Sequence, residues 1–500
     1  MTRFSRSVSI FVVVAFTAAN LAAGSPAPAD PTALLLRPSF SLAASPPPRP
    51  PEGPPSMFSP PPAKPAVPPA ERKPGFKPKP LLAAAEVAGI NLGVWAFLLY
   101  FGDAFYSYIS WETIADNFTD GWEWDRSQYF VNFYHHPYHG YLYYSAGRSS
   151  GLSYWGSALA ALGGSLMWEM MMEKYRPSIN DWITTTCGGI VYGEIGHRFS
   201  ALVRKSDARG LGRIWREFVG TVCDPVGGVN RLLNGREDVD PWLPGSPDVG
   251  RILNGELVVT GPVAARSAEL TGTRGAPLLG FTLAYGDPAG TGWSGKPFDV
   301  FTVRGRLRWG PDRPHLSLFV NGALFGKRSV SANGDAHFLG VYQHYEYYGF
   351  DTMRVCGTSL TGGWTSRFAP GKDVRLTAGA RLGWMGLGGS DDFLGNTGER
   401  REYNLGTGWV AAAEGAIAAK GFEYFSVIWR HYGLFNLRVI GSRPGRESWN
   451  ILQAQIAAPI WSRLGIGAVI EYCGRSFDLE GYDPGSRRLY EARAFLTWQF

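Results

Sequence analysis

The chain has 500 residues, of which 45% are apolar, 18% charged and 14% aromatic. Its 64 glycines and 36 prolines exceed the usual shares of roughly 7% and 5% and, with this composition, exclude a coiled coil, a collagen and a wholly disordered chain. The formal net charge is +6. Such a small excess, without a basic stripe that carries stacking aromatic residues, excludes nucleic acid as an expected partner.

Residues 1–24 predict a secretory signal peptide. Arg3 and Arg6 precede an apolar run from Ile10 to Ala19, and the small residues Ala22-Ala23-Gly24 follow it. A charged segment, then an apolar run and then small residues are typical of an export signal. A transmembrane anchor is the alternative, but the run is far shorter than the ~20 residues that a membrane span needs.

Residues 25–80 predict a disordered, proline-rich linker. Twenty of the 36 prolines lie between Pro26 and Pro80, where they favour polyproline II and remove hydrogen-bond donors. A segment of this kind is an extended spacer of about 3.1 Å per residue. It is compatible with a plain disordered tail, with a tether across a periplasm, or with contact to an anionic polymer.

Residues 81–215 predict a helical domain, and 216–252 a connector. Leu81–Trp111 and Ile179–Val203 have helical patterns. Ser149–Trp168 contains no charged residue over 20 positions but carries four glycines and five serines. We interpret this stretch as a buried or interfacial helix rather than a membrane span.

Residues 253–500 predict an antiparallel transmembrane β-barrel of about 12 strands, so the fold class is mainly β with an α-helical N-terminal domain. Apolar and polar residues alternate, for example from Tyr490 to Phe500, which places them on opposite faces of a strand. Soluble strands are mostly 5–6 residues long, whereas these candidates are roughly 12 to 17 residues long. Lipid requires such a sheet to close on itself. The candidate strands are 253–264, 275–286, 297–310, 313–325, 335–350, 352–368, 372–387, 403–419, 421–435, 447–460, 463–477 and 487–500.

The two faces of the predicted barrel differ in chemistry. The apolar faces end in aromatic residues, as the girdles of membrane barrels do. If the apolar faces meet lipid, five arginines face the lumen: Arg304, Arg306, Arg308, Arg375 and Arg381. They would favour the passage of anions or contact a plug, or they would simply pair with acids of the lumen.

The chain ends at Phe500 on an alternating strand. Outer-membrane barrels commonly end in this way, and the resemblance implies insertion by the outer-membrane assembly machinery. We therefore expect a location in the outer membrane of a Gram-negative bacterium, with membrane lipid as a partner and the N-terminal segment in the periplasm.

The four cysteines do not predict a metal site or a cofactor. Cys187, Cys223, Cys356 and Cys473 are widely spaced and form no CxxC pair, so a zinc site is not expected. Their spacing leaves open whether any pair forms a disulfide.

Polar residues gather between 121 and 200, where any chemistry is expected. Proton transfer at neutral pH suits histidine with carboxylate partners. The candidate catalytic residues are His136, His139, Glu169, Asp181 and Glu194. The candidate contacts for a small anionic or lipid ligand are Asn132, Tyr143, Arg148, Asn180 and Arg198. A metal site at His136, His139 and Glu169 is an alternative, but the i, i+3 spacing of its histidines is common by chance.

These motifs resemble a known bacterial family. Residues about 85–205 are similar to the domain of unknown function 3943 (DUF3943), and barrel-like C-terminal regions are typical of its longer members. The family's activity is not established, so the resemblance implies an envelope location and no reaction. It rests on Asn132, His136-Pro137-Tyr138-His139-Gly140, Tyr143, Arg148, Trp168-Glu169, Pro177-Ser178-Ile179-Asn180-Asp181 and Gly188-Gly189 to Gly193-Glu194.

Three interpretations of the polar cluster remain open. In the structural one, the groups satisfy one another inside an apolar domain, and Gly188, Gly189 and Gly193 let helices pack closely. In the others, the cluster catalyses a reaction or binds a lipid. We expect an outer-membrane barrel with a helical accessory or plug domain and a structural or transport role. The alternative is a membrane-bound enzyme that acts on envelope lipid or glycolipid.

Overall fold

A computed structural model describes most of the chain after residue 77. The described residues are 78–102, 104–125, 127–204, 209–234, 252–260, 265–266, 278–287, 295–309, 314–350, 353–371, 373–391, 403–439 and 441–499. The predicted signal peptide (1–24) and residues 25–77 of the predicted linker lie outside them.

The N-terminal part is helical, as predicted, and the helices continue past residue 215. That predicted boundary falls inside α7 (Gly210–Cys223), which buries Val219 and Cys223 in the core that it shares with α6 (Ile179–Arg204). A helix over 136–149 was not predicted from the sequence. The elements are α2 (Pro80–Tyr100), η1 (Phe105–Ser107), α3 (Trp111–Thr119), η2 (Val131–His135), α4 (His136–Ser149), α5 (Tyr154–Met171), α6 (Ile179–Arg204), α7 (Gly210–Cys223) and α8 (Pro225–Asn234).

Helix α4 lies at the centre of the helical part and crosses α6 at very short range. A Cβ atom added to Gly140 would stand 1.8 Å from the Thr185 carbonyl oxygen. One added to Gly189 would stand 2.4 Å from the carbonyl carbon of Gly140. Small residues at both positions let the two backbones touch, so the predicted role of the α6 glycines in close packing is confirmed.

Helix α2 has the length and composition of a membrane span. Its 21 residues include an 18-residue window of mean hydropathy 1.7, of which 17% is buried. Within the described part of the chain, α5 and the other helices do not meet the same criteria. The interpretation of Ser149–Trp168 as something other than a span agrees with this result.

The C-terminal part is an antiparallel sheet whose ends meet. Strand β1 pairs with β3 on one side and with β13 on the other, for example Val258 with Gly280 and with Thr497. Twelve strands therefore form a hydrogen-bonded ring, as predicted, and the short β2 pairs with β13 further along the edge that β1 occupies. The strands are β1 (Ile252–Thr260), β2 (Ala265–Arg266), β3 (Leu278–Tyr285), β4 (Phe301–Trp309), β5 (Pro314–Val330), β6 (Ala336–Phe350), β7 (Met353–Phe368), β8 (Val374–Asp391), β9 (Asn404–Ala419), β10 (Phe422–Asn436), β11 (Gly445–Trp461), β12 (Leu464–Leu479) and β13 (Gly485–Gln499).

The two faces of each strand differ as the alternation predicted. Along β13, Glu491 and Arg493 are buried, whereas their neighbours Tyr490, Leu496 and Trp498 are about half exposed. Large apolar side chains are exposed in the same way on β8, β11 and β12. The ring thus has a charged interior and an apolar outer wall.

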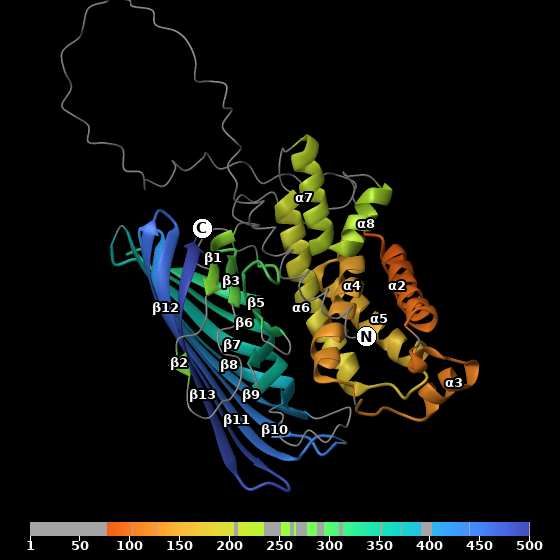
Figure 1. Ribbon diagram of the computed structural model, residues 1–500. Coiled ribbons are helices and arrows are strands. Elements are labelled where there is room, and N and C mark those ends of the chain that lie inside the picture. Colours follow the sequence, from red (N-terminus) through yellow and green to blue (C-terminus); the bar gives the residue numbers. More distant parts are fainter. Residues whose placement is uncertain are drawn as a thin grey trace, which may run out of the picture.

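The helices pack beside this wall (Figure 1). On β6, Tyr345 donates a hydrogen bond to the Phe133 carbonyl (3.0 Å), and Gln343 accepts one from Tyr154 (2.7 Å). The residues that alternate with them along β6, His344 and Glu346, belong to the interior. The helices therefore contact the outer side of these strands. Phe133, Phe199, Tyr285 and Phe301 are among the buried residues that form one hydrophobic core with members from both parts.

Candidate functional site

Four of the predicted catalytic residues come together at one end of α4, α5 and α6. Helix α4 presents His136 and His139, α5 presents Glu169, and Asp181 lies in the first turn of α6. His136 Nε2 stands 3.7 Å from Asp181 Oδ1. Glu169 Oε2 accepts a hydrogen bond of 2.8 Å from the Ser178 backbone N–H, directly before α6.

Glu173 belongs to the same group and was not predicted from the sequence. It follows α5 and accepts a hydrogen bond of 2.7 Å from Trp168 Nε1. Because it lies beyond the end of α5, no helical spacing in the sequence connects it with Glu169. We call His136, His139, Glu169, Glu173 and Asp181 the acid–base cluster.

Burial shifts the pKa values of Glu169, Glu173 and His139 in this cluster. It raises the pKa of Glu173 to about 7, with a further contribution from Asp181. Burial and the neighbouring Glu173 carboxylate raise the pKa of Glu169 well above its ordinary value. The same loss of solvent lowers the pKa of His139 to about 3. Burial therefore favours the protonated forms of Glu169 and Glu173 and the neutral form of His139.

The Glu173 carboxyl group makes the stability of the helical domain depend on pH. Its pKa is raised from 4.5 to about 7 in the folded chain, so the folded state binds more protons than the unfolded state between these values. The free energy of unfolding therefore falls as the pH rises through this window. We expect Glu173→Gln to remove that part of the pH dependence and to stabilise the protein at pH 8. Thermal unfolding at pH 5 and pH 8 measures both effects.

Glu112→Gln on the exposed side of α3 is the matched control for this prediction. It should leave the difference between pH 5 and pH 8 unchanged. Equal behaviour of the two variants would contradict the assignment of the raised pKa to Glu173.

Glu194 lies in a second cluster with Arg148 and Arg198. Its Oε2 stands 3.0 Å from Arg148 Nε, and its Oε1 stands 2.7 Å from Arg198 Nε. Tyr144 donates a third hydrogen bond of 2.7 Å to Oε2. The two guanidinium groups hold the pKa of Glu194 below its usual value. We call Glu194, Arg148 and Arg198 the Glu194 cluster.

The Glu194 cluster links the helices to the strands. Arg198 Nη1 pairs with Asp299 (3.2 Å) and its Nη2 donates to the Pro297 carbonyl (2.7 Å), just before β4. Both carboxylate oxygens of Glu194 are occupied by cations. The cluster is thus a buried structural joint, and the predicted pairing of Glu194 with the histidines is not observed.

The residues predicted to contact a ligand make hydrogen bonds within the protein instead. Asn132 donates to the Tyr403 hydroxyl, next to β9. Asn180 Oδ1 accepts from the Asp125 backbone N–H (2.8 Å). Tyr143 donates to Asn91 of α2, and its hydroxyl lies 2.8 Å from His139 Nε2. Tyr143 thus adjoins the acid–base cluster.

Asp224 forms a third buried group that the sequence did not indicate. It lies 3.2 Å from His197 Nδ1 and accepts a hydrogen bond from Ser145. The serine contacts the aspartate, whereas a nucleophilic triad requires the serine to contact the histidine. The arrangement fastens α4, α6 and the start of α8 together.

Metal and disulfide chemistry find no support in the described part of the chain. It contains no group of three or more His, Cys, Asp or Glu residues that could hold a metal ion. Cys187, Cys223, Cys356 and Cys473 are all free thiols.

Ion pairs cross the interior of the ring. Arg304 of β4 contacts Glu414 of β9 (3.0 Å), and Arg430 of β10 contacts Glu346 of β6 (3.1 Å). These strands are not neighbours. Arg381 also contacts Glu414. Of the five arginines predicted to face the lumen, Arg304, Arg306, Arg308 and Arg381 thus pair with acids, one of the outcomes considered from the sequence, whereas Arg375 is exposed.

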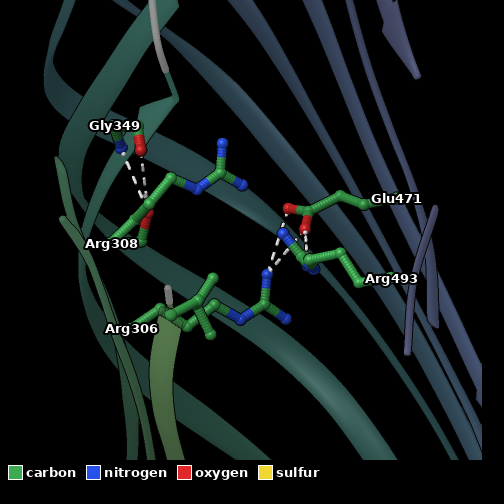
Figure 2. Close-up of a pocket in the computed structure, with 7 residues that line it drawn as sticks. Arg306, Arg308, Gly349, Glu471 and Arg493 are labelled. Atoms are coloured by element: carbon green, nitrogen blue, oxygen red, sulfur yellow. Dashed lines mark hydrogen bonds and ion pairs between the residues drawn. The ribbon is translucent and has the colours of Figure 1, made fainter. Parts of the chain in front are cut away.

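Several polar side chains of this interior meet at Glu471. Arg306 and Arg493 both point toward its carboxylate (Figure 2), at 3.0 and 2.7 Å, and Tyr348 donates to it. A cavity of about 20 Å³ lies between them and is also lined by Arg308 and Gly349. This volume holds about one water molecule, so the space between these side chains is too small for a solute.

The comparisons agree with the helical part of this description. Residues 121–226 match the family described as "Domain of unknown function (DUF3943)". The resemblance predicted from the motifs is therefore confirmed, and the matched segment contains the acid–base cluster and the Glu194 cluster. No curated protein matches the chain.

Two of the solved structures that match overlap about half of this chain. One, described as a NanC porin in a rhombohedral crystal form, is 13% identical, covers 48% of this chain and 98% of its own, and has a TM-score of 0.23. The other, from work on in-meso crystallization of membrane proteins, is 12% identical, covers 49% of this chain and 83% of its own, and has a TM-score of 0.22. At such scores the architecture is argued from the strands of this chain alone.

Proposed function

We propose that the protein is an outer-membrane β-barrel with an occluded lumen, which holds a helical accessory domain against its outer wall. The observation that carries the proposal is a set of ion pairs between strands that are not neighbours in the ring: Arg304 with Glu414, Arg306 with Glu471 and Arg430 with Glu346. An apolar outer wall suits membrane lipid as a partner, and insertion would require the outer-membrane assembly machinery.

The contacts favour a laterally docked domain over a plug. A plug would touch the residues of the interior, whereas Tyr345 and Gln343, which contact the helices, alternate with the interior residues of β6. Charged side chains that fill the interior also leave little room for a solute. A structural role therefore fits better than transport.

Conductance in planar lipid bilayers tests the occluded lumen. We expect the purified full-length protein to give no stable channel. A triple variant, Arg306→Ala, Glu471→Ala and Arg493→Ala, removes the central group together and should raise conductance. Glu480→Ala, in an exposed pair with Arg438, is the control and should stay silent. Steady channels in the unsubstituted protein would overturn the proposal.

The acid–base cluster supports a second candidate, an enzyme that acts on envelope lipid or glycolipid. His139, with a pKa of about 3, is neutral at pH 7, so a ring nitrogen can accept a hydrogen bond. Glu173, with a pKa of about 7, is partly protonated and able to donate one. Neighbouring groups whose pKa values are pushed apart are a mark of acid–base sites.

Product analysis by mass spectrometry tests this candidate. The full-length protein is incubated with lipopolysaccharide and phospholipid vesicles, and the same is done with His139→Ala and Glu169→Gln. An enzyme gives a product that both variants lose, whereas Glu112→Gln keeps it. Absence of turnover, or turnover unchanged in both variants, would reject the candidate.

A further inference from the structure

Helix α7 turns its large apolar side chains outward. Leu211, Ile214, Trp215 and Phe218 follow the spacing of a single helix face, yet they are 84%, 63%, 50% and 51% exposed. The opposite side packs through small residues: a Cβ atom on Gly220 would stand 2.5 Å from Arg204 Nε. In a water-soluble protein, an amphipathic helix packs its large apolar side chains against the core and exposes its polar ones.

Helix α8 continues this face. Val229, Leu232 and Leu233 are 50%, 82% and 77% exposed, again at i, i+3 and i+4. On its inner side, Asn230 donates a hydrogen bond of 2.8 Å to Ser149 of α4. The two helices thus share one exposed apolar surface, made by Leu211, Ile214, Trp215, Phe218, Leu232 and Leu233, which we call the α7–α8 face.

The surroundings of this face are basic. Between Arg204 and Arg231 the sequence has six basic residues and three acidic ones, an excess of 6 − 3 = +3. Arg204, Arg213 and Arg231 pair with Glu217 at 2.6 to 3.2 Å and are only 10–23% exposed, whereas Arg209, directly before α7, is exposed. A helix with Trp, Phe and Leu on one side and arginines on the other is typical of segments that lie in a membrane interface.

The position of the α7–α8 face matches that environment. Figure 1 shows α7 and α8 toward the end of the sheet at which β13 finishes. There the outer wall exposes Leu496 and Trp498, so the apolar wall and the α7–α8 face lie at the same end of the molecule. Tryptophan at the end of a membrane strand marks the lipid–water boundary.

We propose that the α7–α8 face inserts into the acyl and headgroup boundary of the leaflet beside the barrel, with the exposed Arg209 toward anionic headgroups. The inference rests on the proposed membrane location of the barrel and adds a second point of membrane contact in the helical domain. The basic excess favours an anionic lipid surface over a second copy of the chain, which would carry the same charge.

Spin labels in the full-length protein test the proposal. Labels are placed by Ile214→Cys on the α7–α8 face, by Leu496→Cys on the outer wall, and by Glu480→Cys in the exposed turn after β12. The protein is reconstituted in phosphatidylethanolamine and phosphatidylglycerol vesicles. Collisions with oxygen report lipid, and collisions with a water-soluble nickel chelate report water. The native thiols are buried or half-buried, and the unsubstituted protein supplies the labelling background.

We expect the Ile214 label to collide with oxygen rather than nickel, at a depth of about 5–10 Å in the boundary, as the Leu496 label does and the Glu480 label does not. Nickel access at Ile214 with lipid access at Leu496 would overturn this inference alone. Nickel access at both would also overturn the proposed membrane barrel. An Ile214 label shielded from oxygen and nickel alike would indicate a protein on this face, such as a second copy, and would overturn the inference.

Discussion

Replacement of Gly140 by alanine is expected to destabilise the helical domain more than the same replacement at any other glycine of that domain. The added Cβ would stand 1.8 Å from the Thr185 carbonyl oxygen and 3.1 Å from Gly189 Cα. Both obstacles are backbone atoms, so no side chain can rotate out of the way. Overpacking of a core typically costs about 1–3 kcal/mol and sometimes more, and we expect the upper end because α4 and α6 must separate. Thermal unfolding followed by circular dichroism measures the loss.

Gly163→Ala is the matched control for the crossing of α4 and α6. Gly163 also lies within a helix, α5, but a Cβ atom there meets nothing within 4 Å. Alanine is a better helix former than glycine by about 0.8–1.0 kcal/mol, so this variant should be neutral or more stable. Equal unfolding temperatures of the two variants would contradict the steric conflict predicted at Gly140.

Glu194→Gln is expected to cost about 3–5 kcal/mol of stability, the usual effect of breaking a buried ion pair by removing one partner. Glutamine keeps the volume of the side chain but leaves Arg148 and Arg198 facing each other without the carboxylate that both contact. Arg198 also contacts Asp299, so the loss should reach the joint between helices and strands. Chemical unfolding of the detergent-solubilised protein measures the change, and limited proteolysis shows whether the helical part loosens first.

Glu480→Gln provides the comparison for the loss of a carboxylate. Its partner is Arg438, and both side chains are more than half exposed. Exposed ion pairs contribute little to stability, so this change should have little effect. A small effect of Glu194→Gln, equal to that of Glu480→Gln, would show that the Glu194 cluster is solvated rather than buried.

Local pattern was sufficient to predict the strands. Side chains that alternate from Tyr490 to Trp498 divide between a buried and an exposed face whatever the rest of the chain does, because the period of a strand is two residues. The same argument placed Arg304 and Arg306 in the interior. What it could not supply was their partners, because Glu414 and Glu471 lie more than a hundred residues away.

The candidate site was predicted less completely. His136, His139, Glu169 and Asp181 were correctly expected to be close, since motif residues of one small domain tend to converge. Glu194 was grouped with them, although the crossing of α4 and α6 carries it to the other end of the helices, beside Arg148. Glu173 was missed because it stands in a turn, where no periodicity marks it.

The sequence by itself determined the order of a helical part and a barrel, the two faces of the strands and the identity of the charged residues, because these depend on neighbours two to four positions apart. Only the tertiary structure decided that the helices contact the outer wall, that the interior arginines are neutralised across the ring, and that α7 presents its apolar side outward. Each of these depends on which surfaces are buried against one another, and burial is a property of the assembled fold.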